Sequence, residues 1–306
     1  ASLEAKSVAA YIKKVVRDNA GLAHKDVAVL YRTNAQSLPL QVEFVLNRIP
    51  YFVRSEDNIL ENEVLERLLG VLRLKLASRA RRAPKPDDGI LTLKAYFRYV
   101  DPNVVGKLHS LFARETDFLA AIRSQAFFSI MPKAKESRLV AGVESVMGAR
   151  TLLDTLDVLA KNFNGVRGMI GSLEDVIGER VPLGEIYELA SSFGSDIEDF
   201  VTTMDGALDQ ARASGAGRDE ATGVALLTYF RAKGRQWHTV ILTTCNEGLI
   251  PHKRAPIEDE RRLFYVALTR ASANLFASYV KNACKVTVAP SRFLKDWLEA
   301  YYLKAI

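Results

Sequence analysis

Cysteine and histidine are scarce in this sequence, which has two cysteines and four histidines among 306 residues. Cys245 and Cys284 do not have the spacing of a disulfide framework. Together with the scattered histidines, they also lack the spacing of metal ligands. We therefore expect no metal site and a reducing, cytoplasmic setting. No apolar run reaches the roughly 18 residues of a membrane-spanning helix, so we expect no membrane partner.

A phosphate-binding loop is also missing. The sequence contains no Gly-x-x-x-x-Gly-Lys-Ser/Thr stretch, and no predicted strand ends in an acidic pair suited to magnesium. Such a loop forms the backbone nest that holds the β- and γ-phosphates of a nucleotide. The chain also begins with Ala1 rather than methionine. We therefore expect it to be a fragment whose missing N-terminal half holds the loop.

The composition is that of an ordinary globular protein, with 48% hydrophobic and 25% charged residues. The formal net charge of +6 permits a polyanionic partner such as nucleic acid. An unevenly charged solvated surface would give the same net charge, so the charge alone does not decide between the two.

Apolar periodicity predicts an α/β domain interrupted by a helical insertion. The run at 26–31 lacks polar alternation, which is typical of a parallel strand covered on both faces. A basic and then Pro/Gly/Asp-rich stretch marks the start of the insertion. Further strands are expected at 51–53, 223–230, 239–244 and 274–280, and helices at 3–16, 40–47, 61–76, 104–130, 136–161, 172–177, 196–212, 258–271 and 292–302. The predicted domains are 1–76 with 214–306, and the insertion 77–213.

Tyr31 and Arg32 stand at the carboxyl end of the first predicted strand, immediately after the run Val27 to Leu30. Ligands of open parallel sheets bind outside the carboxyl ends of the strands. An aromatic ring and a guanidinium at that place could stack on a base and bind a phosphate. Alternatively, Arg32 simply reaches solvent at the end of the strand.

Arg270 continues the apolar stripe of the helix predicted at 258–271, which includes Leu263 and Ala267. A guanidinium on a core-facing stripe requires an anionic partner, because an unpaired buried charge costs several kcal/mol. That partner could be a structural carboxylate or a nucleotide phosphate. We interpret Glu260, Arg261 and Arg262 as a charged start of the same helix.

A basic loop follows the strand predicted at 223–230. It combines three cations, a glycine and an indole, a composition suited to contacting phosphates. A solvated basic turn would look similar. The residues are Arg231, Lys233, Gly234, Arg235 and Trp237.

Three stretches, in this order, resemble the signature motifs of the UvrD/Rep-type superfamily 1 DNA helicases. They are 26–37, 228–252 and 259–271, and the helix at 63–74 is similar as well. The resemblance implies a RecA-like, P-loop NTPase-type parallel-sheet domain, the second of two motor domains. Residues 77–213 would be the family's mobile inserted subdomain, which contacts duplex DNA. Phe230 and Gln236 depart from the family's usual histidine and glutamate, which indicates a divergent branch.

The resemblance also implies roles for individual residues. Arg32 and Arg270 would converge on one cleft and stabilise the γ-phosphate of ATP, the arginine-finger role. Tyr31 would stack on adenine, and Gln236 with Gly234 would face the nucleotide. ATP and Mg²⁺ would be bound mainly by the N-terminal P-loop domain of the same protein. The expected DNA contacts are Thr228, Phe230, Arg231, Lys233 and Arg235.

The function that this resemblance implies is that of an ATP-dependent 3′ to 5′ DNA helicase or translocase, acting in repair or recombination. Its substrates would be single-stranded and partly duplex DNA. The alternative is a non-enzymatic nucleic-acid-binding or scaffold protein derived from the same domain. Retention of both Arg32 and Arg270 favours the enzyme.

The missing phosphate-binding loop leads to a direct prediction. The purified 306-residue chain, assayed with Mg-ATP and single-stranded DNA, should release no phosphate above background. ATP turnover by the chain alone would contradict this expectation.

Overall fold

The chain folds into two units. The computed structural model describes residues 3–54, 57–167, 173–176, 179–182, 185–218, 220–283 and 286–304. We call residues 1–60, 173–192 and 206–306 the sheet unit, and residues 61–172 and 193–205 the helical unit. The helical unit begins earlier than the predicted boundary at 77, because helix α3 (Glu63–Arg79) packs along α4 (Pro86–Phe97).

The sheet unit is built on five strands that pair only in parallel. Their order is β2-β5-β1-β6-β7, so the first strand of the chain lies at the centre. The predicted α/β class with a parallel sheet is thereby confirmed. The strands are β1 (Val27–Tyr31), β2 (Tyr51–Phe52), β5 (Val224–Thr228), β6 (Trp237–Leu242) and β7 (Ala271–Ala277).

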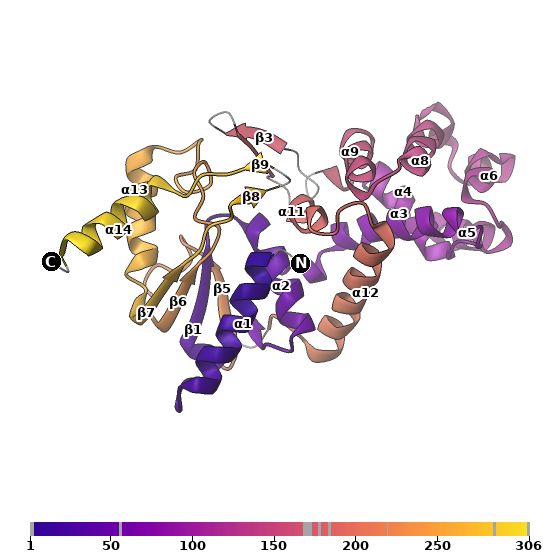
Figure 1. Cartoon of the computed structure of the whole chain (residues 1–306). Coiled ribbons are helices and arrows are strands. Elements are labelled where there is room, and N and C mark those ends of the chain that lie inside the picture. The colour runs from indigo at the N-terminus through magenta and orange to yellow at the C-terminus, as the bar shows by residue number, and fades with distance from the viewer. Residues whose placement is uncertain are drawn as a thin grey trace. The chain divides into compact units, whose positions relative to one another are not determined.

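Helices cover both faces of this sheet, which explains why β1 is apolar throughout (Figure 1). Ala28 and Leu30 point into a core shared with α13 (Ile257–Leu268) and α14 (Arg292–Lys304). The other face is covered by α1 (Leu3–Asp18) and α2 (Ser37–Leu46).

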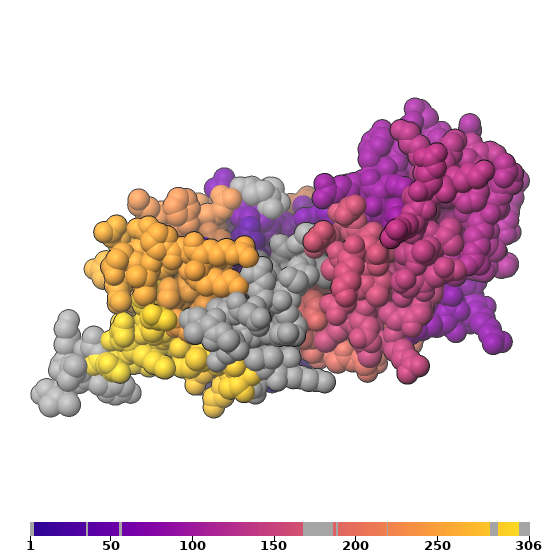
Figure 2. Space-filling model, turned by 90° about the horizontal axis from the view of Figure 1, so that it is seen from above, coloured from indigo at the N-terminus to yellow at the C-terminus, as the bar shows by residue number. Residues whose placement is uncertain are grey.

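Helix α14 lies against α13. The rings of Phe264 on α13 and Phe293 on α14 are 5.8 Å apart between centroids. In the space-filling view, the yellow surface of the C-terminal residues lies next to the orange surface of the residues around 250 (Figure 2). The last helix thus closes the core on this face of the sheet.

Parallel pairing gives the sheet two chemically different edges. At the carboxyl edge, where the strands end, Tyr31 is level with Thr228 and Leu30 with Leu242. At the amino edge, where the strands begin, Trp237 is level with Ala271. Five residue steps of β6 separate the edges, about 16 Å at the usual rise per residue.

The helical unit consists of short helices packed around α3 and α4. A Cβ at Gly70 of α3 would lie 2.5 Å from the Cβ of Leu91 on α4, so only glycine permits this close approach. The other helices of this unit are α5 (Pro102–Arg114), α6 (Phe118–Arg123), α7 (Gln125–Ile130), α8 (Leu139–Gly148), α9 (Leu152–Asn162) and the first half of α12 (Ile197–Ser214).

One predicted helix is wrong. Residues 172–177 were expected to be helical, but Leu173–Val176 forms strand β3 and pairs antiparallel with β4 (Glu179–Pro182). Six residues are too few for apolar spacing to separate a helix from a strand, and a pairing partner follows closely in the sequence. The remaining elements of the sheet unit are α11 (Glu185–Ser191), β8 (Asn282–Ala283) and β9 (Val286–Thr287).

The expectations for membrane spans and for the cysteines can be compared with the structure. Among the described residues, no helix combines the length and the apolar character needed to cross a membrane. Cys245 is a buried free thiol. Cys284 lies outside the described residues.

A buried lysine closes one helix of the helical unit. The ammonium group of Lys75 on α3 donates hydrogen bonds to the carbonyl oxygens of Val146, Met147 (3.2 Å) and Ala149 (2.8 Å). These carbonyls lie at and just after the end of α8, where the amide of Ala149 also donates to the carbonyl of Val146 (3.3 Å). A cation there meets the negative end of the helix dipole. Burial, and then the nearby charge of Arg79, lower the pKa of Lys75 to about 8.

Lys75→Met should destabilise the helical unit by about 2–3 kcal/mol, because it removes three charge-assisted hydrogen bonds from a buried ammonium group. The unfolded chain keeps the ordinary, higher lysine pKa and therefore binds more protons than the folded chain above pH 8. The stability difference between the parent and the variant should grow as pH rises from about 8 towards 10. Urea unfolding at several pH values measures it. Lys107→Met, at an exposed lysine on α5, is the control and should change little.

Candidate nucleotide and nucleic-acid site

The loop between β5 and β6 runs from the carboxyl edge back to the amino edge. The buried Tyr229 and Ala232 anchor it to the core. The amide of Ala232 donates to the carbonyl of Thr228 (3.1 Å), and the amide of Arg235 to the carbonyl of Ala232 (3.1 Å). Gly234 adopts φ +81°, where a side chain is strained, although a Cβ there would touch nothing. The glycine therefore serves the turn of the backbone.

Arg270 lies at the amino edge, between the end of α13 and the start of β7. Its guanidinium donates to the carbonyl oxygens of Val266 (2.8 Å) and Arg235 (3.0 Å) and to the hydroxyl of Thr269 (2.9 Å). Within the described part of the chain, no carboxylate lies within ion-pair distance of it. Neutral groups therefore hold Arg270 in place and leave its positive charge uncompensated.

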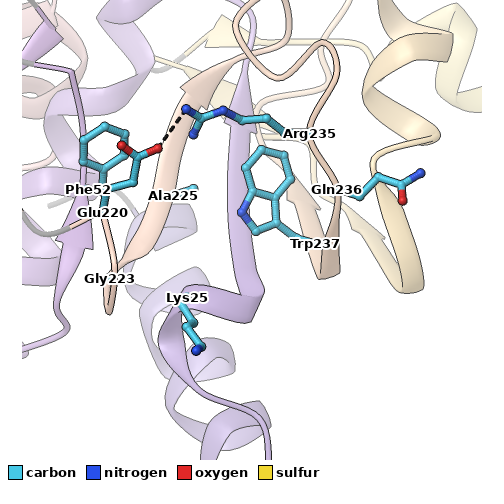
Figure 3. A pocket seen from close by; sticks show the side chains of 8 residues that line it. All are labelled: Lys25, Phe52, Glu220, Gly223, Ala225, Arg235, Gln236 and Trp237. Atoms are coloured by element: carbon cyan, nitrogen blue, oxygen red, sulfur yellow. Dashed lines mark ion pairs between the residues drawn. The ribbon is translucent and has the colours of Figure 1, made fainter.

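Gln236 stands beside Arg270 at the same edge. It is exposed and lines a pocket of about 350 Å³ together with Trp237, Arg235 and residues that precede β1 and β5. In Figure 3 its side chain points away from the other residues of the pocket. Arg235 forms an ion pair with Glu220 (2.8 Å) across the pocket (Figure 3).

Arg32 lies at the opposite, carboxyl edge and is bound by Glu260 of α13. Its Nε and Nη2 donate to both carboxylate oxygens, at 2.7 to 3.1 Å. The carboxylate of Glu260 also accepts from the amide of His252 (2.9 Å). Burial alone would raise the pKa of Glu260, but the hydrogen bonds from Arg32 and His252 hold it below its ordinary value. Glu260 therefore remains charged and joins β1, α13 and the loop before α13.

The structure does not bring Arg32 and Arg270 together. They lie at opposite edges of one sheet, next to opposite ends of α13, and Arg32 has a nearly buried internal carboxylate as its partner. The two guanidinium groups therefore do not meet within this chain, because Arg270 precedes its strand and Arg32 follows its own. Their convergence on one nucleotide stays a prediction.

Tyr31 is also placed differently from the expectation. Its side chain is fully buried in the central strand and faces the interior near Ser37 and Asp57. Burial raises the pKa of its phenol. In this chain the ring is not exposed for stacking, and its contact with adenine stays a prediction.

The residues expected to contact DNA fall into two groups. Thr228, Phe230 and Arg231 lie at the carboxyl edge, where Phe230 is 75% exposed and Arg231 pairs with the nearly buried Asp57 (3.2 Å). Lys233 and Arg235 lie further along the loop towards the amino edge, and both are exposed. All five residues were expected to contact DNA, and the return of the loop across the sheet divides them between its two edges.

Two residues of the carboxyl edge, Glu260 and Glu4, were not predicted from the sequence. Glu260 was interpreted as part of a charged helix start, yet it lies four residues before Phe264 and seven before Ala267, both buried, and so belongs to the core-facing stripe. Glu4 of α1 accepts hydrogen bonds from the amide and hydroxyl of Thr244 (2.7 Å each). No local signal marked Glu4, because its partner lies 240 positions away.

The described residues contain no group of three or more His, Cys, Asp or Glu side chains that could hold a metal ion.

The Arg32–Glu260 pair leads to a stability prediction. In a double-mutant cycle with Arg32→Met and Glu260→Gln, the coupling energy should be about 1–3 kcal/mol, because the pair is largely buried and doubly hydrogen-bonded. The matched control is the exposed pair Arg262–Asp259 on the same helix, whose coupling should be near zero. Urea unfolding of the four chains in each cycle measures both values. Equal coupling in the two cycles would contradict the structural role of Glu260.

Comparison with known protein families identifies part of the sheet unit. Residues 183–282 match the family model described as the UvrD-like helicase C-terminal domain. This range contains the loop between β5 and β6, helix α13 and Arg270.

Relatives extend the match to almost the whole chain. The ATP-dependent DNA helicase PcrA of Staphylococcus epidermidis is 26% identical over 93% of this chain and 41% of its own length. The putative ATP-dependent DNA helicase YjcD of Bacillus subtilis is 27% identical over 97% of the chain and 39% of its own length. The chain thus spans about two fifths of the length of these curated relatives. The family match, the relatives and the parallel-sheet fold thus support the resemblance of the chain to the C-terminal half of UvrD/Rep-type superfamily 1 helicases.

Proposed function

We propose that this chain is the second motor half of an ATP-dependent DNA helicase or translocase. Both relatives carry the name of an ATP-dependent DNA helicase, which supports the reaction class. In this proposal a P-loop domain of the same protein holds ATP and Mg²⁺, and the present chain supplies contacts to the nucleotide from one edge of its sheet and to DNA from the other.

The amino edge is proposed as the nucleotide edge. Arg270 would contact the γ-phosphate and stabilise the charge that develops on phosphoryl transfer. Gln236 would hydrogen-bond the ribose, and Gly234 would let the loop approach the nucleotide closely. This chain's part in the reaction is then to orient the nucleotide and to place one fixed positive charge beside its terminal phosphate.

The carboxyl edge is proposed as the DNA edge. Thr228 would contact a phosphate, the exposed ring of Phe230 would stack on a base, and Arg231 would contribute positive charge. Lys233, further along the loop, would add a second cation near the backbone. Stacking and phosphate contacts are sequence-tolerant, as a protein that moves along single-stranded DNA requires.

The finer assignments rest on the family resemblance. We propose 3′ to 5′ movement, duplex contacts made by the helical unit, a role in repair or recombination, and a cytoplasmic location.

One observation carries the proposal. Arg270 is fixed by two carbonyls and a hydroxyl, has no carboxylate partner among the described residues, and stands beside Gln236. A purely structural arginine on a core-facing stripe would be expected to have an internal anion, as Arg32 has. The missing anion is most simply the phosphate of a bound nucleotide.

In the intact protein, Arg270→Ala should reduce DNA-stimulated ATP hydrolysis by about 10³ to 10⁵, the range for loss of an arginine finger in related NTPases. Binding of single-stranded DNA should stay within a few-fold, because the DNA contacts lie at the other edge. Steady-state phosphate release and a DNA-binding titration measure the two effects.

Arg262→Ala is the matched control, since Arg262 is an exposed arginine on the same helix, and it should hydrolyse ATP normally. Normal ATP turnover by the Arg270→Ala variant would contradict the proposed contact of Arg270 with the nucleotide. It would favour the alternative of a non-enzymatic scaffold protein. An equal loss in a folded Arg32→Lys variant would show that the two arginines do meet in the working protein.

A further inference from the structure

One guanidinium group of the helical unit is surrounded by three carboxylates. Arg73 on α3 binds Asp205 on α12 through its Nε (3.1 and 3.2 Å) and its Nη2 (2.5 Å). Its Nη1 lies 3.5 Å from a carboxylate oxygen of Glu66 on α3 and 3.6 Å from one of Asp88 on α4. The cluster therefore holds more negative than positive charge, and Arg73 has alternative partners beside the one that it binds.

The carboxylates of Asp88 and Asp205 differ in their access to water. The side chain of Asp88 is only 8% exposed, whereas that of Asp205 is 38% exposed. Burial raises the pKa of Asp88 to about 6, although the charges of Arg73 and Lys85 lower it. At pH 7, Asp88 is thus a nearly buried anion. It needs a cationic partner more than Asp205 does, because water can hydrate an exposed carboxylate.

Helix α12 is held by different interactions on the two sides of Gly206. Before this glycine lies the ion pair of Asp205 with Arg73, and after it Gln210 donates a hydrogen bond to the carbonyl of Val45 on α2 (2.6 Å). Gly206 has no packing role, because a Cβ there would meet nothing within 4 Å. A glycine inside a helix weakens it, so α12 is weakest directly after the ion pair.

The first half of α12 also packs through an apolar stripe. Phe200, Val201 and Met204 of this stripe are buried. Apolar contacts are not directional, so they tolerate a small shift of a helix better than a bidentate ion pair does. The pair of Arg73 with Asp205 therefore determines where the first half of α12 lies.

Breaking a partly buried ion pair is usually costly, because it leaves a charge without a partner. Here both charges have an alternative, since Arg73 can turn to the other two carboxylates and Asp205 can be hydrated. We infer that Arg73 is an ion-pair switch, which exchanges Asp205 for Asp88 and Glu66 and so lets the first half of α12 shift away from α3. A static ion-pair network is the alternative, and it predicts the opposite effect of neutralising Asp88.

Hydrogen exchange of the 306-residue chain at pH 7 tests the switch. Asp205→Asn should speed exchange of the amides at 200–204 about tenfold, because it removes the ion pair that holds α12. Asp88→Asn should slow exchange of the same amides several-fold, because Arg73 then loses its main partner in the shifted arrangement. If Asp88 only helped to hold the helices together, this substitution would speed exchange.

Two controls separate the switch from a general change in stability. Asp87→Asn removes an 81% exposed carboxylate from the same turn of α4 and should leave exchange at 200–204 unchanged. The amides of α8 and α9 should keep their parent rates in the Asp88→Asn variant, because these helices do not contribute to the cluster.

The pH dependence gives a second measurement. The charged groups around Asp88 are Arg73 and Glu66 from α3, Asp205 from α12 and Lys85 before α4, whereas His109 of α5 faces the neighbouring Asp87 (3.7 Å). A protonated Asp88 no longer attracts Arg73, so acid favours the pair with Asp205. Exchange at 200–204, corrected for the intrinsic effect of pH, should slow as pH falls from 7 to 5. The Asp88→Asn variant should lack this change.

In the intact protein, the consequence of the switch rests on the proposed function. Asp88→Asn should lower the rate of duplex unwinding several-fold, because it holds the helical unit in one arrangement. Hydrolysis of ATP stimulated by single-stranded DNA should not change, since no residue proposed to contact nucleotide or DNA is altered.

Faster exchange at 200–204 in the Asp88→Asn variant, or equal slowing in α8 and α9, would overturn the switch. Normal unwinding by a variant whose α12 exchanges slowly would overturn its control of unwinding. Neither result touches the motor assignment, which the Arg270→Ala variant tests separately.

Discussion

Parallel pairing of β1 with its neighbours is the constraint on which the arrangement of this protein depends. Because every strand of the sheet runs the same way, residues that follow strands and residues that precede strands lie at opposite edges, about 16 Å apart. The apolar content of β1 makes this pairing stable, since both faces are covered by helices. The separation of two chemically distinct edges follows directly from this geometry.

Helix α13 spans the distance between these edges. Glu260 near its start holds Arg32 and the amide of His252 at the carboxyl edge, and Arg270 follows its end at the amino edge. The loop from Thr228 to Gln236 makes the same crossing on the same face of the sheet. A displacement of the backbone at one edge can therefore be transmitted to the other edge through these two short, well-packed segments. Such transmission suits a protein in which the nucleotide state and DNA binding are proposed to be coupled.

Sequence reasoning recovered the fold because apolar patterning is local. The runs at 27–31, 224–228 and 237–242 are buried strands, and the helix before Arg270 forms as expected. It failed at 173–176, where a pairing partner outweighed a short helical pattern. The site was harder to predict from the sequence. Glu260, the partner of Arg32, lies 228 positions away, and the course of the loop after Thr228 depends on tertiary packing. Motif resemblance identified the residues, but only the topology of the sheet assigns each to an edge.

We propose that nucleotide and DNA engage opposite edges of this sheet. Hydrogen exchange of the intact protein tests it most directly. A non-hydrolysable ATP analogue should protect amides around 234–237 and 270–271, and single-stranded DNA alone should protect those around 228–231. Protection of 32–34 by the ATP analogue, or of 234–237 by DNA alone, would contradict the account.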